Sequence, residues 1–228
     1  MATTTIPAVS SGLTPAKRSQ LTKYFTWSLD HKVIGVQYLV TSFTFFLIGG
    51  ALAMLIRANL LTPNSGLFID KATYNAVFSM HGTIMIFLFV IPTFIGFANY
   101  MVPLLIGAKD MAFPWLNAFS FWLIIPAGIL LLVGWMVGPP EAGWTAYFPL
   151  SGPIYSHADG QTLWAVSLHL LGISSIFGAI NFLVTVKNMR TPGMGWFQMP
   201  LFVWAMFATS IIILLATPFL SGALTLML

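Results

Sequence analysis

Long apolar runs alternate with short polar segments along almost the whole chain. Prolines occur inside several of these runs, and membrane helices tolerate them because neighbouring helices can satisfy the freed backbone groups. Crossing a bilayer as a helix takes about 20 residues. Five runs are long enough: residues 33–56, 76–105, 116–138, 163–186 and 200–228. The pattern therefore predicts an all-α fold, a polytopic bundle with about five transmembrane helices.

The composition agrees with a membrane location. Hydrophobic residues make up 58% of the 228 residues, and charged residues only 6%. Soluble domains carry about 25% charged residues, so a single soluble core is excluded. The chain has no cysteine, which also excludes a disulfide framework, a thiolate metal site and a cysteine nucleophile.

The basic residues predict the orientation of the bundle. Residues 1–22 are polar and lack the apolar core of a signal peptide, so we expect a cytoplasmic tail followed by a membrane domain at 23–228. Lys and Arg near membrane ends favour the cytoplasmic side. With five spans, only Arg57 and Lys71 lie on the far side. Seven lie on the side of the N-terminus, which is therefore predicted to be cytoplasmic: Lys17, Arg18, Lys23, Lys32, Lys109, Lys187 and Arg190.

His81 lies within the least polar stretch of the chain. An intramembrane histidine is a functional-site candidate by default, and a neutral imidazole is a strong axial ligand for haem iron. The alternative is a tolerated core residue. Arg57 ends the first span on the outer side, at a depth that we expect to be comparable. It is either a snorkelling anchor or a cation that faces a carbonyl or anionic group of a cofactor.

Asp110 lies in the short loop between the second and third spans. It is either a loop carboxylate paired with Lys109 or the mouth of a proton path. Buried amides and hydroxyls need partners, which are often ordered waters, and water chains carry protons. Such side chains gather near the inner halves of spans two to four: Asn99, Asn117, Ser120, Ser174, Ser175 and Asn181.

The remaining histidines carry weaker expectations. His31 stands at the membrane entrance and is predicted to be interfacial, whereas His157 lies in a loop and is predicted to be solvated. For His169, in the fourth span, we expect a core histidine with satisfied hydrogen bonds. The long outer loop at 139–162 holds several aromatic residues, which suit a membrane interface, and we expect it to form an ordered cap.

Eight segments, in order along the chain, resemble subunit I of haem–copper oxidases. They are DHKVIG at 30–35, LIR at 55–57, HGTIMIF at 81–87, IGAKDMAFP at 106–114, GWT at 143–145, SSIFGAINF at 174–182, NMRTPGM at 188–194 and PLFVW at 200–204. The resemblance implies a fold of twelve helices, of which this chain matches the first five. We therefore expect the chain to be the N-terminal part of a longer subunit.

The resemblance also implies roles for individual residues. His81 would be one axial ligand of a low-spin haem, and Arg57 would contact the formyl group of that haem, which implies haem A. Asp110 would open a proton path. The path would continue through Asn99, Asn117, Ser120, Ser175 and Asn181. The second axial ligand, the second haem and the copper site would belong to the later helices, so no catalytic residue is expected in this portion.

The implied function is electron transfer from cytochrome c through the low-spin haem to an oxygen-reducing haem–copper centre, coupled to proton pumping in a bacterial plasma membrane or an equivalent energy-transducing membrane. Expected partners are the remaining helices of subunit I, subunit II with its copper centre, subunit III, cytochrome c and membrane lipid, with no nucleic acid. Asn59 stands where many members carry a cation-binding glutamate, so that outer metal site is not expected.

Three alternatives remain open from the sequence. A quinol-oxidising member of the same family is one, although the positions that bind quinol in one branch carry Ile48, Leu52, Thr73 and Ala76, which cannot replace the polar residues used there. A transporter lined by the intramembrane polar residues is the second. The third is an assembly subunit without a cofactor of its own.

Overall fold

The computed structural model describes residues 22–61, 71–156 and 158–228, and within these residues the chain is helical with no strand. Five helical segments are long and apolar enough to span a membrane, which confirms the predicted all-α bundle. Most of the predicted tail, and His157, lie outside the described residues. The elements are η1 (Lys23–Phe25), α2 (His31–Asn59), α3 (Lys71–Thr83), η2 (Ile84–Val90), α4 (Ile91–Ile106), α5 (Pro114–Val137), α6 (Ala158–Asn188), η3 (Trp196–Gln198) and α7 (Leu201–Thr225).

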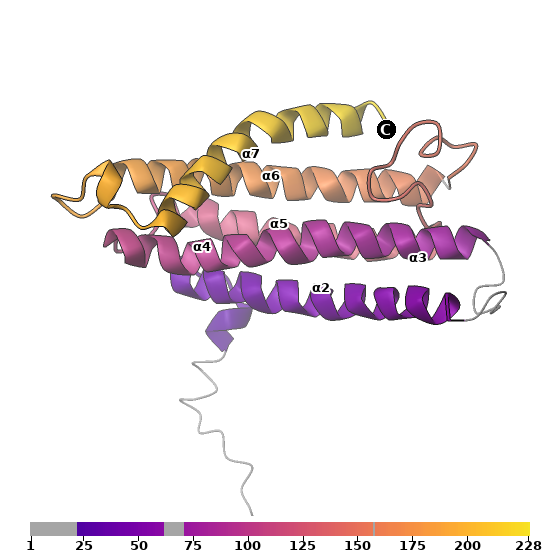
Figure 1. Ribbon diagram of the computed structural model, residues 1–228, viewed down its shortest axis with the longest axis horizontal. Coiled ribbons are helices and arrows are strands. Elements are labelled where there is room, and N and C mark those ends of the chain that lie inside the picture. The colour runs from indigo at the N-terminus through magenta and orange to yellow at the C-terminus, as the bar shows by residue number, and fades with distance from the viewer. Residues whose placement is uncertain (1–21, 62–70, 157) are drawn as a thin grey trace, which may run out of the picture.

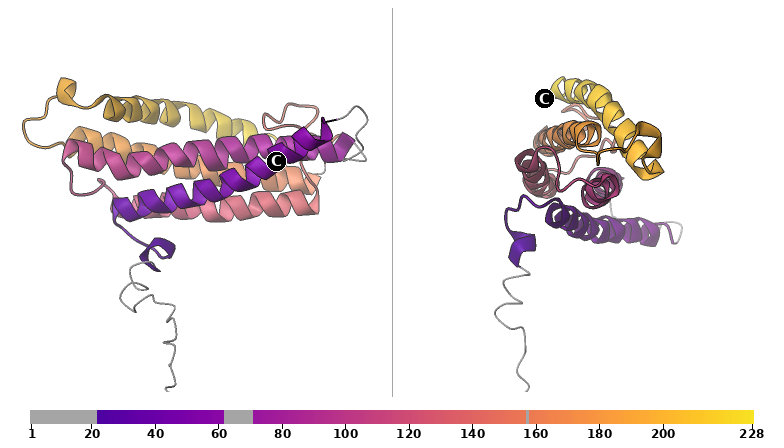
Figure 2. Two further views of the ribbon diagram at one scale, coloured as in Figure 1. Left: turned by 60° about the horizontal axis from the view of Figure 1, so that its bottom comes forward. Right: turned by 90° about the vertical axis from the view of Figure 1, so that its left-hand side faces the viewer.

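The long helices lie side by side with their axes roughly along one direction (Figures 1 and 2). α3, η2 and α4 together form the second span, Lys71–Ile106. α2 packs against this span, α5 packs against α6, and α6 packs against α7, while α4 also contacts α6 and α7. We call the end that holds the start of α2 and the α4–α5 loop the inner end, and the opposite end the outer end.

Small residues let α2 and α4 approach closely. A Cβ atom built on Gly35 would lie 2.9 Å from the carbonyl oxygen of Gly96, and one built on Gly96 would lie 2.9 Å from Cβ of Tyr38. Backbone contact of this kind is typical of helix pairs in membranes, where association depends on van der Waals packing rather than on the hydrophobic effect. The crossing fixes α2 beside the polar residues of α4.

The second span contains a π-helical segment, η2, directly before Pro92. Proline has no N–H and its ring clashes with the carbonyl four residues earlier. The backbone N–H of Ile91 bonds to the carbonyl of Ile86, five residues back, which is the π spacing. The widened turn accommodates the proline without interrupting the span, and it begins three residues after His81.

The outer loop packs onto the second span, as predicted for a cap. The N–H of Gly143 donates to Oγ of Ser79 over 2.8 Å. The ring of Trp144 lies against Gly82, where an added Cβ would come within 2.9 Å of its Cδ1 atom. α6 begins at Ala158, so the loop is shorter than the predicted 139–162. The contacts of Gly143 and Trp144 agree with the expected cap at this part of the loop.

Candidate functional site

His81 is held at one ring nitrogen only. It is half-buried on α3, and its Nδ1 lies 2.9 Å from the carbonyl oxygen of Gly49 on α2. A carbonyl only accepts, so Nδ1 carries the proton and donates, which leaves Nε2 of the neutral ring with a free lone pair. No hydrogen bond occupies Nε2 among the described residues. A fixed tautomer with one ring nitrogen bonded to a backbone carbonyl is the usual state of a metal-binding histidine.

The side chains available as ligands near His81 suit a haem better than a bare metal ion. No group of three or more His, Cys, Asp or Glu that could hold a metal ion occurs in the described part of the chain. A haem asks little of the protein's own donors, because a single histidine can ligate its iron. His81 fits one such ligand.

Arg57 lies farther outward than the sequence suggested. The hydrogen bond from His81 to Gly49 shows that the His81 ring lies at the level of Gly49. Arg57 follows Gly49 by eight residues on α2, which is about 12 Å along the helix axis. The expectation of comparable depth is therefore wrong for the backbone positions. The Arg57 side chain is exposed, so it can extend toward the headgroup region or back along α2.

The loop that carries Asp110 is fastened to α6. The N–H of Phe113 donates to Oδ1 of Asn181 over 2.9 Å, and Nδ2 of Asn181 donates to the carbonyl of Phe113 over 3.0 Å. The N–H of Ala112 donates to Oγ1 of Thr185 over 2.9 Å. Both ends of the Asn181 amide are thus occupied, which makes this residue a clamp on the loop.

Asp110 itself is half-buried and close to its own backbone. Its Oδ1 accepts from the N–H of Met111 over 2.7 Å. The alternative of an ion pair with Lys109 is not found among the described residues, and Lys109 is exposed. The carboxylate therefore lies at the inner end of the bundle, on a loop whose backbone α6 holds in place.

A group of buried polar side chains lies at the inner end, on α2, α4 and α5. His31 is 1% exposed, and its Nδ1 donates to the carbonyl of Asn99 over 2.8 Å. His31 begins α2, at the predicted membrane entrance, and packing of α2 on α4 covers its ring. Four buried side-chain atoms of this group have no hydrogen-bond partner: Nε2 of His31, Oδ1 of Asn99, and both Nδ2 and Oδ1 of Asn117.

A second polar group continues toward the membrane interior. The Oγ of Ser120 donates to the carbonyl of Asn117 over 2.8 Å. Its single proton is thereby used, so the hydroxyl of Tyr38, 3.0 Å away, is the donor to Ser120 Oγ. Oγ of Ser174 donates to the carbonyl of Ser120 over 2.7 Å. Tyr38 was missed from the sequence, although its spacing of seven residues from His31 places both on one face of a helix.

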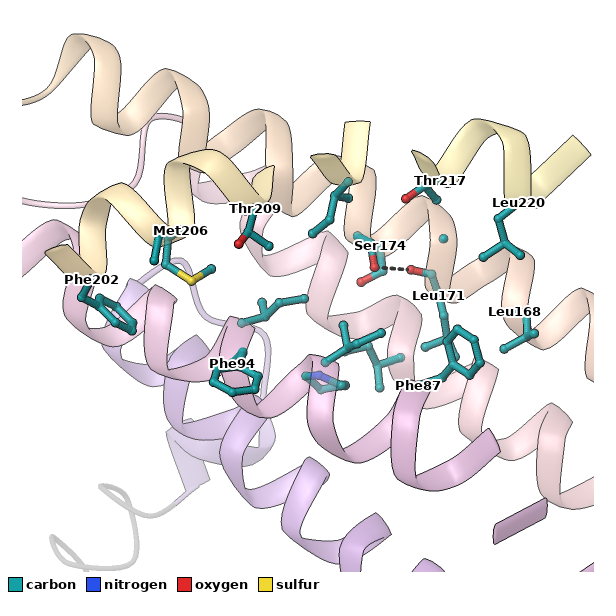
Figure 3. A pocket seen from close by; sticks show the side chains of 18 residues that line it. Phe87, Phe94, Leu168, Leu171, Ser174, Phe202, Met206, Thr209, Thr217 and Leu220 are labelled. Carbon is teal, nitrogen blue, oxygen red and sulfur yellow. Dashed lines mark hydrogen bonds between the residues drawn. The ribbon is translucent and has the colours of Figure 1, made fainter. Parts of the chain in front are cut away.

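Ser174 and Ser175 also line a cavity of about 540 Å³ between η2, α4, α5, α6 and α7 (Figure 3). Its walls are mainly apolar side chains such as Phe87, Phe94 and Phe202. Oγ of Ser175 donates to the carbonyl of Leu171 over 2.9 Å. Of the polar residues predicted at the inner halves of the spans, Asn117, Ser120 and Ser174 are thus linked through backbone carbonyls, and Ser174 reaches this cavity, whereas Asn181 lies beside the loop.

His169 differs from His81 in its bonding. Its Nδ1 lies 2.9 Å from the carbonyl of Ala165, and its Nε2 lies 3.1 Å from Oγ1 of Thr225 on α7. Both ring nitrogens therefore have a protein atom within hydrogen-bonding distance, as predicted, but the ring is half-buried and not in the core. His81 is thus the one of these two intramembrane histidines that keeps a nitrogen available.

Comparison with known proteins identifies the family to which this chain belongs. The family described as cytochrome c and quinol oxidase polypeptide I matches residues 33–228. The chain belongs to this family. The resemblance seen in the sequence segments is therefore confirmed, and the family match includes His81, Arg57 and Asp110.

Relatives in this oxidase family cover nearly the whole chain. The protein named cytochrome c oxidase subunit 1 from Synechocystis sp. is 54% identical over 210 residues, 92% of this chain and 38% of the relative. The protein of the same name from Thermostichus vulcanus is 53% identical over 90% of this chain and 37% of its own length. That from Corynebacterium efficiens is 46% identical over 85% and 34%. The chain thus spans less than two fifths of the length of these relatives.

Proposed function

We propose that this chain forms the N-terminal part of the catalytic subunit of a respiratory terminal oxidase. In this proposal, electrons pass from cytochrome c through a low-spin haem, of the A type, to an oxygen-reducing haem–copper centre, and proton pumping is coupled to that transfer. The relatives are named cytochrome c oxidase subunit 1, an oxidoreductase. The remaining helices of subunit I, subunit II with its copper centre and subunit III are the proposed partners, in an energy-transducing membrane with the N-terminus cytoplasmic.

The observation that carries the proposal is the bonding of His81. A ring fixed through Nδ1 to Gly49, with Nε2 left free, presents a lone pair in a set direction. When bound, the haem supplies one-electron redox chemistry. His81 would hold that group through Nε2, and Arg57 would place a positive charge toward the outer end. The second axial ligand is proposed to come from outside this chain.

The proton path in this proposal begins at Asp110. Water held by the unpaired atoms of His31, Asn99 and Asn117 would pass protons from the carboxylate to Tyr38 and Ser120. An unpaired buried polar atom is costly, and ordered water is its usual partner. Ser174 and Ser175 would continue the path to the cavity between η2 and α7. Asn181 serves this path by fixing the loop backbone.

A quinol-oxidising member of the family remains the alternative, since the family description includes quinol oxidases. The side chains at two of the four relevant positions speak against the known type of quinol site, because Leu52 is 4% and Ala76 is 1% exposed. Neither can hydrogen-bond a quinol. A transporter or an assembly subunit leaves the free nitrogen of His81 without a role.

The test is a pair of histidine substitutions in the assembled complex. His81→Ala should abolish the low-spin haem absorbance, because it removes an axial ligand. His169→Leu is the matched control, since that histidine lies in the same membrane region with both nitrogens already bonded, and it should retain the band. An unchanged low-spin spectrum in a stable His81→Ala complex would refute the proposal.

A further inference from the structure

The loop that carries Asp110 is held by Thr191 at the end opposite to the Asn181 clamp. Thr191 follows α6, in the segment that leads to η3. Its backbone N–H and its Oγ1 both donate to the carbonyl of Ile106, each over 2.9 Å. Ile106 is the last residue of α4, directly before the Asp110 loop. The α6–η3 segment and the end of α4 lie at the same end of the bundle (Figures 1 and 2).

The end of α4 is shaped to receive these two bonds. The last four carbonyls of a helix have no partner within it, and a carbonyl oxygen can accept two hydrogen bonds. Gly107 adopts the left-handed conformation, with φ of +73°, and an added Cβ would collide with Oγ1 of Thr191. The absence of a side chain at Gly107 thus lets the hydroxyl reach the end of the helix.

The segment that carries Thr191 is itself anchored to α7. The guanidinium carbon of Arg190 lies 4.1 Å from the ring centre of Trp196, which is a cation–π contact. The Trp196 ring packs on the rings of Trp204 and Phe207, with centres 5.7 and 5.3 Å apart. Nε1 of Trp204 also donates to the Trp196 carbonyl over 3.0 Å. Thr191 therefore bonds to α4 from a position that α7 supports.

The carboxylate of Asp110 depends on the loop backbone for its direction. Its Oδ1 accepts from the N–H of the adjacent residue, Met111, over 2.7 Å, so the carboxylate follows any movement of the loop. α6 holds the far end of the loop through Asn181, and Thr191 holds the near end. Loss of the Thr191 bond frees the turn that leads from α4 to Asp110.

We infer that Thr191 is a positioning residue for Asp110. The inference rests on the proposed function, in which Asp110 takes up protons at the inner end of the bundle. The Thr191 hydroxyl fixes the turn after α4, and this turn places the carboxylate where it passes protons to the interior. Thr191 carries no proton in this role, because its hydroxyl proton is held by the Ile106 carbonyl.

Three substitutions separate the Thr191 hydroxyl from the rest of the side chain. Thr191→Val puts a methyl group in place of Oγ1, and the methyl cannot lie 2.9 Å from a carbonyl oxygen, since carbon–oxygen contacts begin at about 3.3 Å. The helix end and residue 191 therefore separate. Thr191→Ala removes the hydroxyl without this crowding, and Thr191→Ser retains it. Thr191 is exposed, so all three variants should fold.

Proton uptake by the assembled complex tests the inference. The complex is reduced chemically and mixed with oxygen, and proton uptake is followed with a pH-sensitive dye. Thr191→Val and Thr191→Ala should slow uptake about threefold to tenfold, the equivalent of one hydrogen bond, with the low-spin haem spectrum unchanged. Thr191→Ser should take up protons at the unaltered rate. Unaltered uptake in both the valine and the alanine variants overturns the inference.

A double variant shows whether Thr191 acts through Asp110. Asp110→Asn alone should slow uptake, and adding Thr191→Val should slow it no further, because effects that pass through one group are not additive. If the second substitution still exerts its full effect, Thr191 acts elsewhere and the inference is wrong. If Asp110→Asn leaves uptake unchanged, the proposed proton path is wrong as well. If Asp110→Asn slows uptake and the Thr191 variants do not, the inference alone fails.

Thr44→Val is the matched control. Oγ1 of Thr44 donates to the carbonyl of Val40 over 2.9 Å, within α2, and the side chain is exposed. This substitution also removes a threonine hydroxyl that bonds to a carbonyl, but it leaves the Asp110 loop untouched, so uptake should not change. Equal slowing by Thr44→Val and Thr191→Val would assign the loss to general destabilisation and overturn the inference.

Discussion

Two buried asparagines at the inner end of the bundle should respond very differently to the same substitution. Asn181 is 0% and Asn117 is 1% exposed. Asn181 bonds to both the N–H and the carbonyl of Phe113, whereas the side-chain atoms of Asn117 have no partner in the protein. Leucine is close to asparagine in size and shape, so replacement by leucine removes polarity with little change in packing.

The expected magnitudes follow from this bonding. Asn181→Leu removes two hydrogen bonds and leaves the N–H and carbonyl of Phe113 to find other partners. Each loss costs about 1 kcal/mol if water replaces the amide, and up to about 3 kcal/mol if it does not. The loop that carries Asp110 should therefore open about 2–6 kcal/mol more easily. Asn117→Leu breaks no side-chain hydrogen bond, and its cost should stay below about 1 kcal/mol.

Amide hydrogen exchange measures the difference. The N–H groups of Ala112 and Phe113 both donate to α6, so their protection reports the opening of the loop. A decrease of 2 kcal/mol in the free energy of opening corresponds to about a 30-fold faster exchange. We expect at least that acceleration in Asn181→Leu and less than about fivefold in Asn117→Leu. Equal acceleration in the two variants would refute the division of these asparagines into clamp and unpaired groups.

Two pairs of glycine substitutions test the helix packing and the backbone conformation. Gly35→Leu forces a side chain against the backbone of Gly96 and should lower stability by about 1–3 kcal/mol, read as a lower thermal unfolding temperature in detergent. Gly50→Ala, where an added Cβ meets nothing within 4 Å, should not lower it. Gly107 has φ of +73°, so Gly107→Ala should cost about 1–2 kcal/mol and accelerate proteolysis of the following loop. Gly178→Ala, with open space around its Cβ, should leave that cleavage rate unchanged.

The spans could be predicted because hydrocarbon imposes a simple rule. Every backbone polar group must be satisfied within the segment, so a long apolar run has to be a helix. The predicted run 116–138 and the observed Pro114–Val137 differ by only a few residues. The start of α6 was placed too late, at 163, because its first turn contains Asp159 and Gln161. Polar residues at a helix end do not register in a hydropathy pattern.

The candidate site was predictable in its residue types and less so in their roles. The sequence gives no reason to assign different roles to Asn99, Asn117 and Asn181, and only their contacts in the fold distinguish them. Asn181 bonds to a loop residue 68 positions away in the chain. His31 was expected at the interface because it follows Asp30 at the start of a span. Its burial depends on the approach of α4, which brings the carbonyl of Asn99 within 2.8 Å. Such long-range pairings leave no local pattern in a single sequence.

The bonding at the inner end also explains why unpaired atoms persist there. His31 is tied to the backbone of α4, and Nδ2 of Asn99 donates to the carbonyl of Ile95. Ser120 is bonded to the backbone of Asn117. The side chains of His31, Asn99 and Ser120 are each fixed by one bond to a carbonyl, so they cannot rotate to pair elsewhere, whereas the side chain of Asn117 makes no hydrogen bond. The remaining atoms of His31 and Asn99 therefore stay buried without a partner in the protein, and a rigid bundle maintains polar positions that a flexible one would close by internal hydrogen bonding.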